Sequence, residues 1–171
     1  IYGLLTIFIH ACTMEGKQVE DSDSGIHVMA YYYAGWKQHD IEKLQLDKLT
    51  HIIYSFTEVI DNEMKFKNDS SALVLRNLVE QKRQYPQLKV MIACGGWGGS
   101  GGFSDMARSE ENRKKFVDSA VRFIKEYELD GLDIDWEYPG LRGIGNPYIP
   151  EDKENFTALM RELREGMNKI S

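Results

Sequence analysis

Three carboxylates in the segment 130–139 have the spacing that acid–base chemistry requires. Asp133, Asp135 and Glu137 occupy every second position, and apolar residues fill the positions between them. Because successive side chains of a β-strand point to opposite faces, the three carboxylates should share one face. No Lys or Arg lies within this segment to neutralise them. Carboxyl groups crowded in this way share protons or hold one at neutral pH, so the pattern predicts a coupled acid site.

A divalent-metal site is the main alternative for these carboxylates, because their oxygens could hold calcium or magnesium. An EF-hand loop needs a glycine at its sixth position and polar neighbours, whereas Ile134, Trp136, Tyr138 and Pro139 intervene here. The four histidines show no ligand spacing either. We therefore expect an acid site that uses no metal and no other cofactor.

Runs of β-forming residues alternate with amphipathic helical patterns after residue 26. Strands are expected at 27–33, 49–59, 88–94 and 130–137, with a short apolar-alternating piece at 64–67. Pro139 should end the last strand just after Glu137. Helices are expected to begin at Ser70 or Ser71, at Ser109 and at Pro150. Four strands that alternate with helices predict a parallel α/β fold, either half of a barrel or a small open sheet.

The acidic segment resembles the signature of the family 18 glycoside hydrolases, the chitinases and their relatives. Asp130, Asp133, Asp135 and Glu137 fill the family pattern Asp-x-x-Asp-x-Asp-x-Glu, within a segment that ends Trp-Glu-Tyr-Pro. The resemblance runs from about residue 27 to the end of the chain. It implies a TIM (β/α)8 barrel, of which residues 26–171 would form the N-terminal half, about four βα units. In such a barrel, the carboxyl ends of the strands form the active-site face.

The glycine-rich segment 95–102 contains the spacing Gly-x-Gly-x-x-Gly, which also occurs in dinucleotide-binding folds. Those folds need a helix that starts within the motif, whereas the next helix here is expected only at Ser109. The segment instead resembles the second signature of family 18, with Gly95, Gly96 and Trp97 at the end of the third strand. The resemblance implies that these glycines and Gly98 let the backbone approach a sugar, and that Trp97 supplies an apolar floor.

Aromatic residues follow several of the expected strands. Four of them match family positions that contact the sugar: Tyr32, Trp36, Phe56 and Tyr138. Tyr31 and Tyr33 are expected to pack in the core instead. The chain departs from the family pattern at Ala93, where Ser is frequent, and at Gly98, where Asn is common.

The resemblance also implies a reaction, the hydrolysis of β-1,4 bonds in chitin with retained configuration. The N-acetyl oxygen of the substrate would attack the sugar carbon. Glu137 would serve as general acid and base, Asp135 would hold the acetamido group, and Asp133 would share a proton with Asp135. Asp130 would be structural. Two alternatives stay open: a chitin-binding lectin on the same fold, and an endo-β-N-acetylglucosaminidase that acts on N-glycans.

The N-terminal segment 1–25 is interpreted as a partial signal peptide followed by a polar leader, with a buried strand as the alternative. Its apolar run at 1–9 is too short for a transmembrane helix. A secreted, extracellular protein is therefore expected, with Asn68 and Asn155 as glycosylation acceptors if the source is a eukaryote. Cys12 would leave with the signal, and Cys94 would remain an unpaired thiol.

The length and the net charge of the chain limit the number of domains and the kinds of partner to be expected. The 171 residues suit one domain, and the net charge of -6 argues against a nucleic-acid partner. The expected partner is chitin or chitooligosaccharides, with no membrane association after signal cleavage, and the complete protein is expected to be a monomer. The 171-residue chain alone is expected to be inactive, because half a barrel leaves strand edges unpaired.

Overall fold

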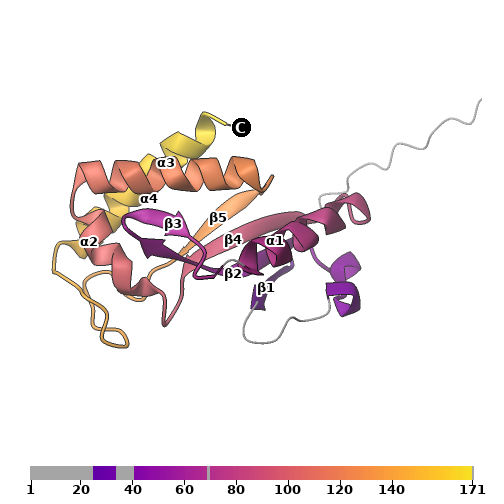
Figure 1. Cartoon of the computed structure of the whole chain (residues 1–171), viewed down its shortest axis with the longest axis horizontal. Helices are drawn as coiled ribbons and strands as arrows, with labels where there is room; N and C mark the ends of the chain where they lie inside the picture. Colours follow the sequence, from indigo (N-terminus) through magenta and orange to yellow (C-terminus); the bar gives the residue numbers. More distant parts are fainter. Residues whose placement is uncertain (1–24, 34–40, 69, 171) are drawn as a thin grey trace, which may run out of the picture.

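The computed structural model describes residues 25–33, 41–68 and 70–170. Its centre is a sheet of four parallel strands in the order β1 (Met29–Tyr33), β2 (His51–Ile60), β4 (Lys89–Gly95) and β5 (Gly131–Asp135) (Figure 1). A short strand, β3 (Glu63–Lys65), folds back antiparallel onto the end of β2. The predicted parallel α/β fold is therefore confirmed, and β1 and β5 form the edges of the described sheet.

Helices connect the parallel strands. They are α1 (Ser70–Glu80), α2 (Phe103–Ala107), α3 (Glu110–Glu126) and α4 (Asp152–Asn168), with the short 3-10 turns η1 (Ile41–Lys43), η2 (Leu46–Lys48), η3 (Gln81–Arg83) and η4 (Ser100–Gly102). Helices α3 and α4 lie side by side (Figure 1). None of the helices in the described ranges is long and apolar enough to span a bilayer.

One face of the sheet is apolar and packs against the helices. The register aligns Tyr32, Tyr54, Ile92 and Leu132 in one row across the four strands. The helices bury apolar side chains in the same core, among them Leu75, Leu78, Phe116, Ala120 and Leu159. Because side chains alternate along each strand, the residues on either side of this row point to the other face. That other face carries the predicted acids.

Helix α3 begins as the sequence predicts. The Ser109 hydroxyl accepts a hydrogen bond from the backbone N–H of Asn112 at 3.1 Å, and Glu110 and Glu111 lie in the first turn. Helix α1 begins differently, because the hydroxyls of Ser70 and Ser71 both donate to Oδ1 of Asn68, at 2.7 and 3.0 Å. The side chain of Asn68, which precedes the helix, thus binds the side chains of the first two helical residues.

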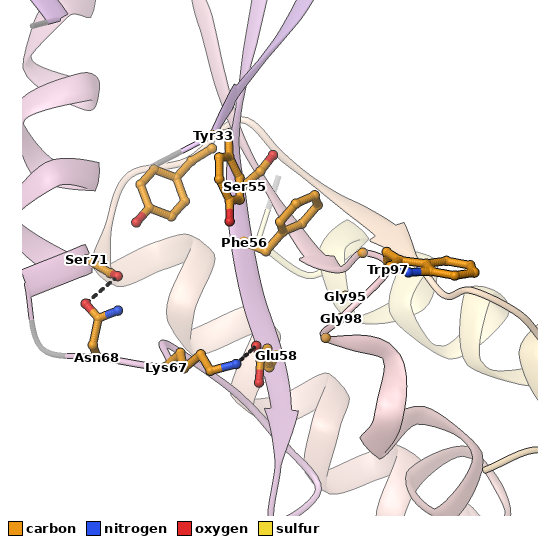
Figure 2. Close-up of a pocket in the computed structure, with 13 residues that line it drawn as sticks. Tyr33, Ser55, Phe56, Glu58, Lys67, Asn68, Ser71, Gly95, Trp97 and Gly98 are labelled. Atoms are coloured by element: carbon orange, nitrogen blue, oxygen red, sulfur yellow. Dashed lines mark hydrogen bonds and ion pairs between the residues drawn. The ribbon is translucent and has the colours of Figure 1, made fainter. Parts of the chain in front are cut away.

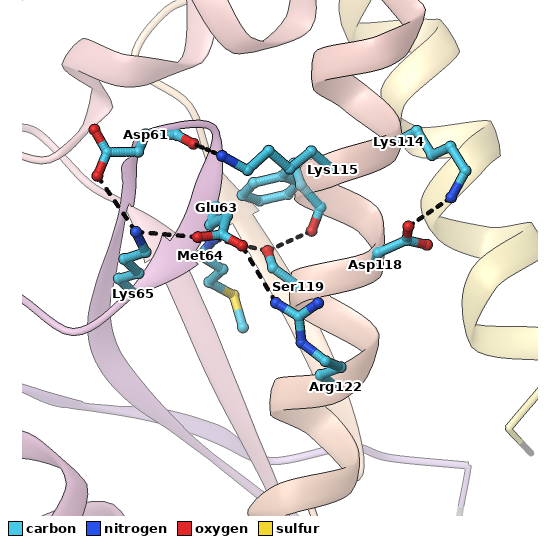
Figure 3. A network of polar contacts seen from close by, with 10 residues as sticks. Asp61, Glu63, Met64, Lys65, Lys114, Lys115, Asp118, Ser119 and Arg122 are labelled. Atoms are coloured by element: carbon cyan, nitrogen blue, oxygen red, sulfur yellow. Dashed lines mark hydrogen bonds and ion pairs between the residues drawn. The ribbon is translucent and has the colours of Figure 1, made fainter.

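A polar network fixes strand β3 against helix α3 (Figure 3). Glu63 forms ion pairs with Lys65 at 3.0 Å and with Arg122 at 3.3 Å. Beneath them, the buried Ser119 hydroxyl accepts the Met64 N–H at 2.9 Å and donates to the Phe116 carbonyl at 2.7 Å. Strand β3, which pairs with the end of β2, is therefore tied to helix α3.

Two differences from the sequence prediction bear on the site. Strand β5 ends at Asp135, two residues before the expected end, so Glu137 lies in the segment that follows the ladder. The glycine-rich segment is not a simple loop, because it contains η4 and continues directly into α2. Both differences place backbone from the glycine-rich segment beside Glu137.

Candidate active site

The carboxylates lie at the carboxyl ends of the parallel strands. In the ladder between β4 and β5, Asp133 pairs with Ala93 and Asp135 pairs with Gly95. Leu132 and Ile134 pack against the helix-side core, so strand alternation directs the two aspartates to the opposite face. Asp133 and Asp135 therefore share one face of the sheet, as the alternation in the sequence predicted.

The electrostatic surroundings of Asp135 disfavour its ionised form. Burial raises the pKa of Asp135, and the negative charges of Glu137 and then Asp133 raise it further. None of these three carboxylates forms an ion pair with a Lys, Arg or His of the described ranges. Burial and the two neighbouring acids thus favour the protonated form of Asp135.

Tyr31 joins this set through a hydrogen bond that the sequence analysis missed. Its phenol donates to Oδ2 of Asp133 at 2.8 Å, and this bond, with burial and the nearby acids, raises the pKa of Tyr31 to about 12. The phenol therefore remains a donor at any ordinary working pH. The sequence signal for this placement is the alternation of side chains along β1. Tyr31 is adjacent to Tyr32, which belongs to the apolar row, so Tyr31 points to the opposite face.

That same alternation corrects three predictions for the tyrosines of β1. Tyr31 and Tyr33 do not pack in the core, since their exposed fractions are 59% and 57%. Tyr32, predicted to contact the sugar, is only 4% exposed and lies in the core near Tyr54. The correction is physical: with β1 in this register, Tyr32 points towards the helices, away from the acids.

Tyr138 lies beside Glu137, and Trp97 lies beside Tyr138. A hydrogen bond to Glu137 raises the pKa of the Tyr138 phenol, and the charge of Glu137 adds to the effect. The rings of Trp97 and Tyr138 are 6.4 Å apart at an angle of 65°. Both are substantially exposed, Trp97 at 50% and Tyr138 at 43%. Tyr138 thus contacts the predicted acid, and Trp97, another residue predicted to lie against the sugar, contacts Tyr138.

A pocket of about 520 Å³ opens between the end of β2, the start of α1 and the glycine-rich segment (Figure 2). It brings together five predicted binding residues: Phe56, Gly95, Gly96, Trp97 and Gly98. Polar side chains also line it, including Asn68 and the ion pair between Glu58 and Lys67 at 3.0 Å. These polar residues come from strand β2 and from the segment that leads into α1. No pattern in the sequence marked them as site residues. Trp36 lies outside the described residues.

Backbone geometry explains two of the glycines. A Cβ on Gly95 would lie 2.2 Å from the Asp135 carbonyl oxygen, and Gly95 has a φ of +115°. A Cβ on Gly96 would lie 3.0 Å from the Phe56 ring, at a φ of +79°. Side chains at either position would clash or strain the backbone. The glycines therefore let the glycine-rich segment pack directly against β5 and Phe56.

The loop that follows Tyr138 is anchored by the fully buried carboxylate of Asp152. It accepts hydrogen bonds from the Ser104 hydroxyl and the Ile149 N–H, both at 2.9 Å, and from the Gly140 N–H at 3.4 Å. Three donors compensate the cost of burying this carboxylate. Asp152 thereby ties the start of α4 to α2 and to the loop beside the acids.

Asp130, at the other end of the acidic segment, has a different setting. Its Oδ2 accepts from the Val90 N–H and from Lys82 Nζ, each at 2.8 Å. These contacts join β5 to β4 and to the turn η3, as expected for the structural role that the family resemblance implies. Within the described ranges, no cluster of three or more acids, histidines or cysteines is arranged to hold a metal.

Comparison with known proteins decides the family. The model of the glycosyl hydrolases family 18 matches residues 28–171, which include every carboxylate described above. This chain belongs to glycosyl hydrolase family 18. The family-18 chain is 36% identical over 165 residues to an endochitinase of Manduca sexta, a match that covers 87% of this chain and 29% of that relative.

Solved structures agree with this assignment. A chitinase of Rhizomucor miehei superimposes with a TM-score of 0.71 at 35% identity, covering 81% of this chain and 42% of the other. A family 18 N-acetylglucosaminidase of Paenibacillus barengoltzii gives a TM-score of 0.73 at 38% identity, covering 84% and 41%. The open sheet of this family-18 chain is thus part of a TIM barrel, as predicted. The chain spans less than half the length of these relatives.

Proposed function

We propose that the protein containing this chain is a chitinase that hydrolyses β-1,4 N-acetylglucosamine linkages. The observation that carries the proposal is the set of three carboxylates without a neighbouring cation in a family-18 chain, with the pKa of Asp135 raised by burial and by the charges of Glu137 and Asp133. A set of acids without a neighbouring cation weakens the fold at neutral pH, which is the cost expected where protons serve a reaction. The flanking aromatics Trp97 and Tyr138 offer flat faces suited to pyranose rings.

Each carboxylate has a distinct task in the proposed mechanism. Glu137 protonates the oxygen of the leaving sugar while the acetamido oxygen of the substrate attacks the anomeric carbon, so the protein supplies no nucleophile. Asp135 accepts a hydrogen bond from the acetamido N–H and stabilises the positive charge that develops there. Glu137 then removes a proton from the water that opens the cyclic intermediate, which restores the original configuration.

Asp133 and Tyr31 support Asp135 in this scheme. The raised pKa of Asp135 favours its protonated form, and in this scheme Asp133 is the neighbour with which it shares that proton. The Tyr31 phenol holds Asp133 in place. Substrate rings rest on Trp97, Phe56 and Tyr138, and the glycines 95, 96 and 98 allow close approach of the backbone. We infer that Trp36 adds a further stacking surface.

Glu137→Gln in the protein encoded by the complete open reading frame tests this proposal. The amide keeps the shape of the side chain but cannot deliver a proton, so turnover of a fluorogenic chitobioside should fall at least about 100-fold. Binding of chitooligosaccharides, measured by calorimetry, should stay within about threefold because the stacking contacts are unchanged. Substantial residual turnover by Glu137→Gln would remove Glu137 from the acid's role.

The same assay separates the alternatives. A lectin would bind the oligosaccharides but release no products from colloidal chitin. An endo-β-N-acetylglucosaminidase would cleave the core of an N-glycan and leave chitin intact. A metal-dependent site would lose activity in EDTA and regain it with calcium or magnesium, whereas the proposed mechanism predicts full activity in EDTA. We also expect a secreted, extracellular monomer, to be checked by fractionation and by size-exclusion chromatography.

A further inference from the structure

A buried serine contacts the backbone of the proposed acid. Ser100, in η4, is fully buried, and its hydroxyl accepts the N–H of Glu137 at 2.9 Å. The same oxygen lies 2.9 Å from the Gly96 carbonyl and 3.0 Å from the Asp135 carbonyl. A hydroxyl has one proton and two lone pairs, so it accepts from Glu137 and donates to one of these carbonyls. Ser100 therefore joins β5, the glycine-rich segment and Glu137.

Glu137 needs such a contact because it lies beyond the strand ladder. The last pair of the ladder between β4 and β5 joins Gly95 to Asp135. The Gly96 N–H donates to the Asp135 carbonyl at 2.8 Å, which closes the ladder two residues before Glu137. From that point, the position of the Glu137 backbone depends on side chains.

A second side chain holds the opposite end of the Glu137 peptide. Asn146 donates from Nδ2 to the Glu137 carbonyl at 3.2 Å. The backbone of Gly143 also approaches so closely that a Cβ there would lie 2.4 Å from that carbonyl oxygen. The N–H and the C=O of Glu137 are thus fixed from two sides, by segments that precede and follow it in the chain.

Segment 98–102 also satisfies the Gly-x-Ser-x-Gly pattern of hydrolase nucleophiles, but the geometry gives Ser100 another role. A nucleophile must be exposed to substrate, whereas this side chain has no exposed surface. Its contacts are backbone groups, with Glu137 N–H among them. The hydroxyl is therefore placed to hold backbone.

We propose that Ser100, together with Asn146, is a positioning residue that sets the reach of Glu137 towards the glycosidic oxygen. The inference rests on the proposed function, because it assumes that Glu137 transfers a proton. Proton transfer requires heavy atoms within about 2.6–3.2 Å, and a displacement of about 1 Å can lower the rate about 100-fold. A contact to the backbone of the acid controls that distance without touching the substrate.

The test compares two buried serines in the protein encoded by the complete open reading frame. Ser119 is the matched control, since its hydroxyl also accepts a backbone N–H at 2.9 Å and donates to a carbonyl, but it holds β3 on α3 (Figure 3). Ser100→Ala should lower kcat about 10- to 100-fold with KM within about threefold. Ser119→Ala should lower Tm by a similar amount as Ser100→Ala while kcat stays within about twofold.

Asn146→Ala separates positioning from damage to the binding surface. Ser100 also contacts Gly96, next to Trp97, whereas Asn146 donates to the Glu137 carbonyl from a separate loop. Asn146→Ala should lower kcat about three- to tenfold, a cost expected for one hydrogen bond, with KM unchanged. In both variants the limb of the pH–rate profile governed by Glu137 should move, because the acid sits in altered surroundings.

The outcomes distinguish the two proposals. If the wild-type protein hydrolyses no chitooligosaccharide, or Glu137→Gln remains active, the proposed function fails. If the wild type is active and Glu137→Gln is not, the proposed function stands. In that case, a kcat for Ser100→Ala equal to that of Ser119→Ala, or an unmoved pH profile in both Ser100→Ala and Asn146→Ala, overturns the positioning role.

Discussion

Asp130, just before strand β5, and Asp135, at the end of that strand, have opposite surroundings. Asp130 accepts a backbone N–H and lies 2.8 Å from Lys82 Nζ and 3.8 Å from Lys89 Nζ. Asp135 faces two further acids, and their charges add to burial in raising its pKa. The chemical group is the same, and both residues lie in the segment 130–135. The difference lies in whether the neighbours compensate the charge.

This contrast separates a carboxylate that stabilises the fold from one that serves a reaction. A compensated carboxylate strengthens the structure as long as it is ionised. A carboxylate placed among like charges weakens the structure at neutral pH but keeps a proton available. Substitutions that remove the charge are therefore expected to have opposite effects on stability at Asp130 and at Asp135.

Asp135→Asn should produce the largest effect on activity. The amide cannot stabilise the positive charge that develops on the acetamido group, so kcat should fall about 100- to 1,000-fold in an assay with chitooligosaccharides. The pH–rate profile should also change shape, because the remaining acids titrate as a smaller set. An unchanged profile would show that the three carboxylates are not coupled.

The same variant should be more stable than the wild type at neutral pH. The folded state holds a proton on Asp135 at a raised pKa, so the contribution of this residue to stability falls as pH rises from its ordinary pKa of about 3.9 through the raised value. Asn cannot ionise, so the Asp135→Asn variant does not lose this stability as the pH rises. Thermal unfolding at pH 7 should show a higher Tm for Asp135→Asn, and the difference should vanish at about pH 3, where both forms are neutral. A lower Tm at pH 7 would contradict the comparison.

Asp130→Ala should do the reverse and lower stability with little effect on the chemistry. It leaves the Val90 N–H and Lys82 without this acceptor, so the free energy of unfolding should fall by about 1–3 kcal/mol in urea titrations. The kcat of the folded fraction should stay within about threefold of wild type. The control is Asp118→Ala, which removes an exposed pair with Lys114 (Figure 3) and should cost under about 0.5 kcal/mol. Equal losses for both variants would mean that Asp130 is an ordinary surface charge.

Much of this contrast could be predicted from the sequence. Regular alternation in the segment 130–137 predicted the strand and its acidic face, and Ser109 with the following glutamates predicted the start of α3. These signals are local, because strand period and helix capping depend on neighbours within a few residues. The resemblance to family 18 supplied the identity of the acids.

Contacts between distant segments could not be predicted in this way. The placement of Tyr31 against Asp133 depends on the register of strands 102 residues apart in sequence, and a shift of one residue would have exchanged it with Tyr32. Ser100 gave no signal of this role either, because two of its backbone partners, the Asp135 carbonyl and the Glu137 N–H, lie beyond the whole of α3. Partners for Asp130 came from η3 and β4 by the same kind of long-range packing.

Tyr31→Phe should lower activity less than Asp135→Asn does, and it tests how the acidic face is held together. The phenol, with its pKa of about 12, stays protonated and donates to Asp133 throughout the working range. Removing one hydrogen bond to a charged group costs about 1.5 kcal/mol, which corresponds to a fall in kcat/KM of about tenfold. Tyr33→Phe is the comparison, because Tyr33 faces the same side and contacts Phe56 through its ring, which the substitution keeps. Its effect should stay within about twofold. If the two variants behave alike, the acids hold their positions without Tyr31, and the support for Asp135 must come from Asp133 and the strand alone.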